Sequence, residues 1–337
     1  MRAPGMNFLR AIPFSSTLIG FSLKREKLLK PYISIPQLNL FSRQIIREFY
    51  SFSIDPFASE PDPRLLFLTE NVREVWNSIL SGIVQRKGFL LLTGEKGMGK
   101  TTLISLIYLY LATNGGKVQV IPLFDLPQKI EEIVQALLSG LGLPLEEESE
   151  SRRFSRLESE LIQRSVRGET VALIIDEAQN LRRETLEEIR FLANPSPKIP
   201  NLLQAIFVGD PQFEKNLRSK DLSLLNARIE VRCHLGPLNP EASLVYIEHR
   251  LRKAGSTTSR VFTPRAVSLI TQCSGGNPGT LNRICEEALS VGYNQFKERI
   301  DPANMREILA NLAMEKEHGW LLPPKTLPWI KKSVGKS

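Results

Sequence analysis

The sequence has few cysteines, and their arrangement suits neither a disulfide framework nor a zinc site. Its 337 residues include only Cys233, Cys273 and Cys285, an odd number without a C-x-x-C pair. Cys233 is followed by His234, but a lone Cys-His pair is far more often structural than part of a ligand set. We therefore expect reduced thiols, as in a cytoplasmic protein.

Long hydrophobic runs are also missing. No segment approaches the roughly 20 apolar residues that a membrane-spanning helix needs. The longest, Leu103 to Ala112, directly follows a glycine-rich stretch, and we interpret it as a helix buried against a sheet. The overall composition, 42% hydrophobic and 24% charged, is that of an ordinary globular protein long enough for two domains.

The net charge of +8 is confined to the two ends of the chain. The first 50 residues carry eight Lys or Arg against two Glu, and residues 321–337 carry four Lys and no acid, which leaves 51–320 at −2. Basic ends can hold an anionic membrane surface or nucleic acid. They can equally be solvated tails that aid solubility.

The stretch GFLLLTGEKGMGKTT at 88–102 contains the strongest chemical motif. An apolar run typical of a buried strand leads into G-x-x-x-x-G-K-T, and a helical run follows. The glycines allow a tight turn with inward-pointing N–H groups, the lysine can reach β- and γ-phosphates, and the first threonine can ligate Mg²⁺. The predicted phosphate-binding residues are Gly94, Glu95, Lys96, Gly97, Met98, Gly99, Lys100, Thr101 and Thr102.

Two carboxylates follow a second apolar run. Val171 to Ile175 is typical of a central parallel strand, and Asp176 and Glu177 would lie at its carboxyl end. Asp176, with Thr101, would hold Mg²⁺, and Glu177 would orient and polarise an attacking water. In isolation, surface acids at the end of a strand would explain the pattern better, but the phosphate loop in the same chain favours a site.

Two further candidates are weaker. Asp210 follows the buried run at 202–208, where a polar residue can bridge water and γ-phosphate, although an acid there would repel phosphate. Arg228 precedes the short strand IEVRC, a position from which an arginine can reach the site of a neighbouring subunit. A surface salt bridge explains Arg228 equally well.

Strands and helices alternate up to about residue 238, and strands then disappear. Further strands are expected at 117–123, 202–208 and in IEVRC. After residue 239, four segments each have a proline near the first turn of an expected helix. These expected helices are Pro240 to Ala254, Pro264 to Cys273, Pro278 to Phe296 and Pro302 to Ala313.

The motifs and their order resemble the AAA+ proteins of the ExeA/general-secretion-pathway protein A family. The resemblance covers roughly 48–313 and is carried by GFLLLTGEKGMGKTTL, LIIDEAQNL, LEEIRFLANP, LLQAIFVGDPQF, ARIEVRCHLGPL, YIEHRLRKAG, GGNPGTLNRIC and the preceding FSIDPFASEPDPRLLF. It implies an α/β fold: a P-loop AAA+ core with a mostly parallel sheet flanked by helices, and a small C-terminal helical lid. We expect a poorly ordered basic leader at 1–47, the ATPase domain at 48–238, the lid at 239–313 and a basic tail at 314–337.

Two departures from the family pattern stand out. Asp210-Pro-Gln-Phe213 replaces the usual Gln-Pro-Glu-Leu. Gly279 stands where the lid motif Gly-x-Pro-Arg has its arginine, and Arg283 lies one helical turn later. We expect the lid to sense nucleotide weakly; substitution of Arg283 for the missing arginine is the alternative. An arginine restored at position 279 would then raise basal hydrolysis.

Membership implies an oligomeric, cytoplasmic ATPase that binds ATP and Mg²⁺ and acts as a motor or switch in secretion or envelope assembly, in which case the basic ends would suit the inner-membrane surface. Secretion members continue into a transmembrane helix and a periplasmic peptidoglycan-binding domain. Short relatives resemble TnsC- and MuB-type transposition ATPases, so an ATP-dependent DNA-binding adaptor is an alternative. A nucleotide-binding scaffold without turnover is a third.

Overall fold

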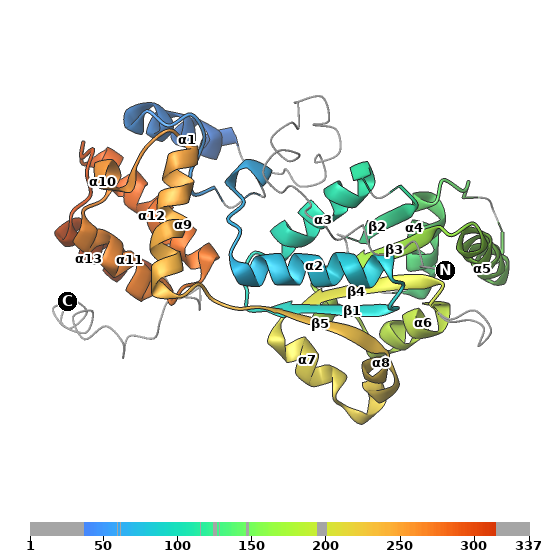
Figure 1. Ribbon diagram of the computed structural model, residues 1–337. Helices are drawn as coiled ribbons and strands as arrows, with labels where there is room; N and C mark the ends of the chain where they lie inside the picture. The colour runs from blue at the N-terminus through green and yellow to red at the C-terminus, as the bar shows by residue number, and fades with distance from the viewer. Residues whose placement is uncertain are drawn as a thin grey trace, which may run out of the picture.

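The computed structural model describes residues 37–314 apart from 59, 61, 115, 124–126, 128, 146–147 and 194–200. Most of the expected leader and almost all of the expected tail lie outside these residues. Within the described part, five parallel strands form one sheet of order β2-β3-β4-β1-β5 (Figure 1). The strands are β1 (Phe89–Gly94), β2 (Val118–Leu123), β3 (Thr170–Ile175), β4 (Leu203–Gly209) and β5 (Ile229–Leu235).

Helices cover both faces of this sheet. One face carries α2 (Glu70–Val84) and α3 (Lys100–Asn114), and α2 begins after Thr69, whose side chain accepts a hydrogen bond from the Val72 N–H. The other face carries α4 (Ile130–Gly140), α5 (Glu150–Val166), α6 (Arg183–Ala193), α7 (Pro211–Leu217) and α8 (Ser223–Ala227). Short 3₁₀ turns are η3 (Pro63–Leu65), η4 (Ala178–Asn180) and η5 (Lys220–Leu222).

The central strands are buried on both sides, which explains their uninterrupted hydrophobic runs. All six residues of β1 and of β3 are buried. Successive side chains of a strand point to opposite faces: Phe89 and Leu91 contribute to the core beneath α4 and α6, and Leu90 and Leu92 to the core beneath α2 and α3. The expected fold class is confirmed: a parallel α/β sheet with helices on both faces, followed by a helical domain.

The helical domain follows β5 and has its own apolar core. Three of its helices begin with proline directly after a capping Asn239, Thr263 or Asn277, because proline lacks the N–H that would have no partner at a helix start. Its helices are α9 (Pro240–Lys253), α10 (Thr258–Val261), α11 (Pro264–Ser274), α12 (Pro278–Asn294) and α13 (Pro302–Met314).

An N-terminal helix packs against this helical domain (Figure 1). This is α1 (Gln37–Tyr50), so the boundary expected at residue 47 falls inside a helix. Tyr50 is buried in the core of the helical domain and donates a hydrogen bond to the Lys297 carbonyl at 3.0 Å. Arg43 pairs with Glu286 of α12 at 3.1 Å. Residues before the sheet therefore contribute to the core of the C-terminal helices.

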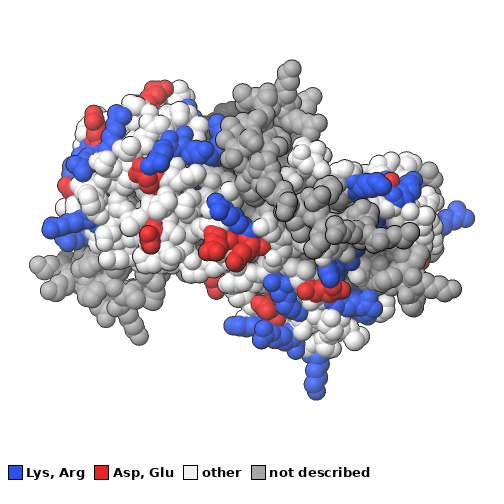
Figure 2. Space-filling view, viewed as in Figure 1, with Lys and Arg blue, Asp and Glu red and all other residues white. Residues whose placement is uncertain are grey.

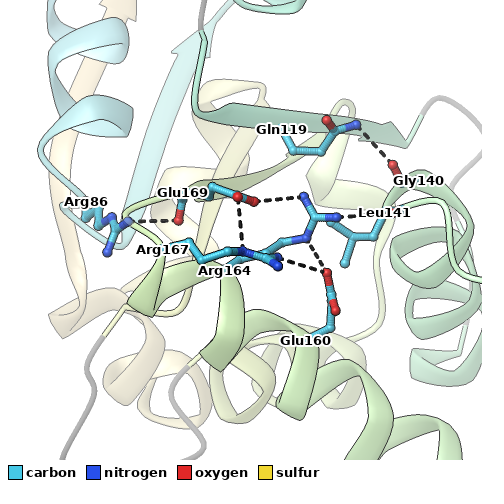
Figure 3. A network of polar contacts seen from close by, with 8 residues as sticks. All are labelled: Arg86, Gln119, Gly140, Leu141, Glu160, Arg164, Arg167 and Glu169. Atoms are coloured by element: carbon cyan, nitrogen blue, oxygen red, sulfur yellow. Dashed lines mark hydrogen bonds and ion pairs between the residues drawn. The ribbon is translucent and has the colours of Figure 1, made fainter.

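A polar network ties three helices to the edge of the sheet where β3 begins (Figure 3). Arg164 of α5 donates to Glu160 at 2.6 Å, to Glu169 at 3.3 Å and to the carbonyl of Leu141, just after α4, at 3.2 Å. Arg86, just after α2, donates to the Glu169 carbonyl at 2.8 Å. The glycine-rich loop follows the carboxyl end of β1, at the opposite edge, so this network supports the scaffold and stays apart from the motif residues.

Candidate functional site

The glycine-rich loop leaves the end of β1 and turns directly into α3. Gly97 and Gly99 have φ angles of +86° and +88°, which side chains rarely allow. A Cβ on Gly97 would also lie 2.6 Å from the side-chain oxygen of Asn277. The glycines of the motif are therefore required by the path of the backbone.

Lys100 is the first residue of α3, and only 6% of it is exposed. Its ammonium donates to the carbonyls of Gly94 at 2.7 Å and Glu95 at 3.2 Å, so the cation lies within the turn of the loop. The first N–H groups of a helix lack intrahelical partners and carry its positive end. The loop, the helix start and the ammonium together provide a cradle for an anion such as phosphate.

The structure joins the two residues predicted to hold a metal. The Thr101 hydroxyl donates to the carboxylate of Asp176 at 2.7 Å, which connects the start of α3 to the residue after β3. Asp176 is 8% exposed. Hydroxyl and carboxylate oxygens are ligands that Mg²⁺ accepts, so this donor set fits a magnesium ion shared with a bound phosphate.

Glu177 lies beside this pair, in a left-handed conformation with φ 52° and ψ 40°. Its N–H donates to Asp176 at 2.9 Å, and its carboxylate accepts a hydrogen bond from the Gln179 side chain. The Gln179 amide oxygen in turn accepts from the N–H of Asp210 at 3.4 Å. Gln179 was not among the predicted site residues; its place two positions after the paired acids was the signal in the sequence.

Asp210 has a structural role. It is the N-cap of α7, and its carboxylate accepts a hydrogen bond from the Phe213 N–H at 2.8 Å. Among the described residues that line the cleft near the loop, Asp210 does not occur. The structure thus shows Asp210 as a helix cap, and its catalytic role stays a prediction from the sequence.

Arg228 lies at the end of α8 and is exposed to solvent. Arg228 lies outside the described lining of the cleft, which includes Lys100, Thr101 and Glu177, and the described residues form no ion pair with it. It belongs to a group of exposed cations on and around α7 and α8, a region where blue side chains gather in Figure 2. These residues are Lys215, Arg218, Lys220 and Arg228.

A cleft of about 1270 Å³ lies between the loop and the helical domain. It is larger than the roughly 300–1,000 Å³ common for small-molecule sites, so it has room for a nucleotide. Leu66 and Phe67 contribute apolar surface. Tyr246 donates to Asn282 at 2.8 Å and accepts from Arg250 at 2.9 Å, and burial raises the pKa of its hydroxyl, which keeps the hydroxyl protonated.

The helical domain reaches the loop through α12. The N–H of Gly279 donates to the Gly97 carbonyl at 2.9 Å, and the Asn277 side chain donates to the Lys96 carbonyl at 2.8 Å. Arg283 lines the same cleft. The contacts of Asn277 were not anticipated from the sequence, which in this segment indicates only a helix that begins at Pro278.

The described residues do not support a clustered metal site, a reactive cysteine or a membrane-spanning helix. They contain no group of three or more His, Cys, Asp or Glu placed to hold a metal ion. The three cysteines are buried and unpaired, and burial raises the pKa of their thiols, that of Cys273 to about 11. None of the described helices is both long and apolar enough to cross a membrane.

Comparison with known proteins agrees with this geometry. A family model described as an AAA domain matches residues 83–217, from the end of α2 to the end of α7. General secretion pathway protein A of Aeromonas hydrophila is 30% identical over 254 residues, which are 75% of this chain and 46% of the relative. The chain therefore contains an AAA domain, at residues 83–217. The chain spans about half the length of that relative.

Solved structures confirm the AAA+ fold. The ORC2 protein of Aeropyrum pernix, in ADPNP–ADP complexes, has a TM-score of 0.57 at 16% identity, covering 77% of this chain and 72% of that one. Cdc6p of Pyrobaculum aerophilum has a TM-score of 0.58 at 15% identity, covering 76% and 70%. At these identities, the similarity of the chain to both structures concerns the fold alone.

Proposed function

We propose that this protein binds ATP with Mg²⁺ in the cleft and hydrolyses it. The observation that carries the proposal is the convergence of three elements: Lys100 within the loop, the bonded pair of Thr101 and Asp176, and Glu177 beside them. Phosphoryl transfer depends mainly on positioning and charge stabilisation, and these residue types supply both.

Each residue has a distinct proposed role. Lys100 and the N–H groups at the start of α3 bind and neutralise the phosphates. Thr101 and Asp176 hold Mg²⁺, which draws charge from the phosphate oxygens when bound. Glu177 accepts a hydrogen bond from the attacking water and orients it toward the γ-phosphate. Glu177 is exposed toward the cleft, as a residue that contacts water and substrate must be.

The test compares Glu177→Gln and Lys100→Ala with the unchanged protein. Glu177→Gln should keep ATP affinity within about threefold and lower turnover at least ~100-fold, the scale of a lost general base. Lys100→Ala should weaken ATP binding about 10- to 100-fold, as expected for hydrogen bonds from a charged donor. Glu230→Gln, the same change at an exposed position on β5, is the matched control. Equal hydrolysis by the Glu177→Gln and unchanged proteins would contradict the proposal.

The charge distribution supports a head-to-tail assembly of several copies. Acidic residues line the cleft, and exposed cations gather around α7 and α8, on a separate part of the surface (Figure 2). Opposite charges on two different surfaces of one molecule favour contacts in which one copy follows the next. The acidic cleft residues are Glu60, Asp62, Glu70, Glu177, Glu241 and Glu286, and they outnumber the cleft cations Lys96, Lys100, Arg250 and Arg283. In such an assembly Arg228 reaches the phosphates in the neighbouring copy.

The biological process that this protein serves is proposed from the name of its relative alone. The relative's printed name places that relative in a general secretion pathway, so we propose a motor or switch that serves export or envelope assembly. The alternative, a DNA-binding adaptor, is supported by the basic ends of the sequence. DNA binding that requires ATP and weakens steeply with salt would favour the adaptor. Tight ATP binding without turnover would indicate a scaffold.

A further inference from the structure

Two contacts join the start of α12 to the phosphate loop. The side-chain amide of Asn277 donates to the Lys96 carbonyl at 2.8 Å, and the backbone N–H of Gly279 donates to the Gly97 carbonyl at 2.9 Å. Gly279 lies in the first turn of α12, where N–H groups have no partner within the helix. The loop supplies that partner. The two domains therefore meet through the backbone of the predicted phosphate cradle itself.

The orientation of the loop follows from these contacts. A trans peptide is planar and places its carbonyl oxygen and N–H on opposite sides. The described chain contains no cis peptide. Because the carbonyls of Lys96 and Gly97 point to α12, the N–H groups of Gly97 and Met98 point away from it, toward the inner side of the turn. The Met98 N–H there reaches the Glu95 carbonyl at 3.2 Å.

Gly279 owes its place to this close approach. Its φ angle lies outside the left-handed region, so its backbone conformation would accept any residue. However, a Cβ on Gly279 would lie 2.8 Å from the Gly97 Cα, closer than real Cβ atoms approach another atom, and 3.2 Å from the Gly97 oxygen, which is a tight contact. Both glycines must therefore lack a side chain for the helix to meet the loop.

We propose that Asn277 is a positioning residue that, with the N–H of Gly279, orders the phosphate loop before nucleotide binds. The proposal rests on the proposed ATP site. It gives the lid a way of acting on that site without an arginine at position 279. Movement of α12 away from the loop would free the two carbonyls and let these peptide planes rotate, which would lower the affinity for nucleotide.

Asn277 can be changed without uncapping α12. Its side-chain oxygen caps the helix by accepting from the Thr280 N–H at 3.1 Å, while its nitrogen donates to Lys96. In Asn277→Ser a hydroxyl can still cap the helix but is too short to replace the amide donor. Gly279→Ala is an independent variant, because it adds a Cβ against Gly97 while favouring the helix itself. Thr263→Ala is the control, since Thr263 caps α11 and has no contact with the loop in the described structure.

The experiment measures amide hydrogen exchange of 95–103 and of Gly279 in the nucleotide-free protein, and separately the affinity for ADP. Asn277→Ser and Gly279→Ala should each speed exchange at Gly279 and in the loop and weaken ADP binding about two- to tenfold, the scale of one hydrogen bond. Thr263→Ala should leave both unchanged. Exchange in both variants equal to that of the unchanged protein, or an equal effect of Thr263→Ala, would overturn the proposal. If the unchanged protein fails to bind nucleotide, the proposed function fails. The exchange measurement would still show whether Asn277 and Gly279 order the loop.

Discussion

The side chain of Gln179 connects Glu177 to the end of β4. Its amide nitrogen donates to the Glu177 carboxylate, and its amide oxygen accepts from the backbone N–H of Asp210. The carboxylate proposed to orient water is therefore held from a neighbouring strand. Because α7 begins directly after Asp210, a displacement of α7 would reach Glu177 through this one side chain.

Gln179→Ala should lower kcat about 5- to 30-fold and leave KM for ATP nearly unchanged. The reason is that the variant keeps the phosphate cradle but allows Glu177 to leave the position from which it orients water. Steady-state ATPase kinetics provide the measurement. Gln212→Ala, which removes an exposed glutamine amide on α7, is the control. A rise in KM without a fall in kcat would show that Gln179 serves binding instead.

Arg228→Ala should preserve ATP affinity and lower hydrolysis per subunit about 1,000-fold or more in the assembled protein, the scale seen when a charge-stabilising arginine is removed. The effect depends on assembly because Arg228 is exposed and, among the described residues, does not line its own cleft. Turnover per subunit of the unchanged protein should rise with protein concentration. Arg252→Ala, an exposed arginine of the helical domain, is the control. Turnover independent of concentration, in both proteins, would refute the role.

Gly279→Arg should weaken nucleotide binding and lower basal hydrolysis. The sequence alone favoured the opposite outcome, because the family pattern has arginine there. The structure changes that expectation, since the first side-chain atom would already meet Gly97. Arg283→Ala, which changes another residue of the cleft lining, should alter hydrolysis less than about threefold. ATPase assays of the two variants provide the measurement. A large loss of hydrolysis in Arg283→Ala would instead make Arg283 the nucleotide sensor of the lid.

Local sequence signals predicted most of the fold. β1 and β3 were found because central parallel strands are buried on both faces and appear as short apolar runs. Proline before the helical segments marked the starts of the C-terminal helices correctly, since proline at the first turn costs no hydrogen bond. The motif residues came together as expected because G-x-x-x-x-G-K-T and the paired acids each follow a strand of one parallel sheet.

Local sequence patterns could not predict the contacts between segments that lie far apart in the chain. Nothing in the residues around α1 indicates that Tyr50 packs beneath α12 and α13, because the partner lies more than 200 residues away. The cap formed by Asp210 looks in sequence like a polar strand end. The contact of Asn277 with the loop depends on the angle between two domains, which no spacing within either domain encodes.

Arg164→Met should lower the free energy of unfolding by about 1–3 kcal/mol without changing ATP affinity. Arg164 is largely buried, and its loss would take the side-chain donor from the Leu141 carbonyl and leave Glu160 and Glu169 paired with the half-exposed Arg167 alone. The network lies at the edge of the sheet where β3 begins, away from the phosphate loop (Figure 3). Denaturant unfolding and nucleotide titration measure the two effects separately.

The matched control is Arg252→Met. Arg252 forms the same kind of i,i+4 pair, with Glu248 at 3.2 Å, but 74% of its side chain is exposed. Solvent screens such a pair, so its loss should cost no more than about 0.5 kcal/mol. Equal destabilisation by the two substitutions would show that burial of the network adds nothing. A loss of ATP affinity in Arg164→Met at unchanged stability would show instead that this edge of the sheet communicates with the cleft.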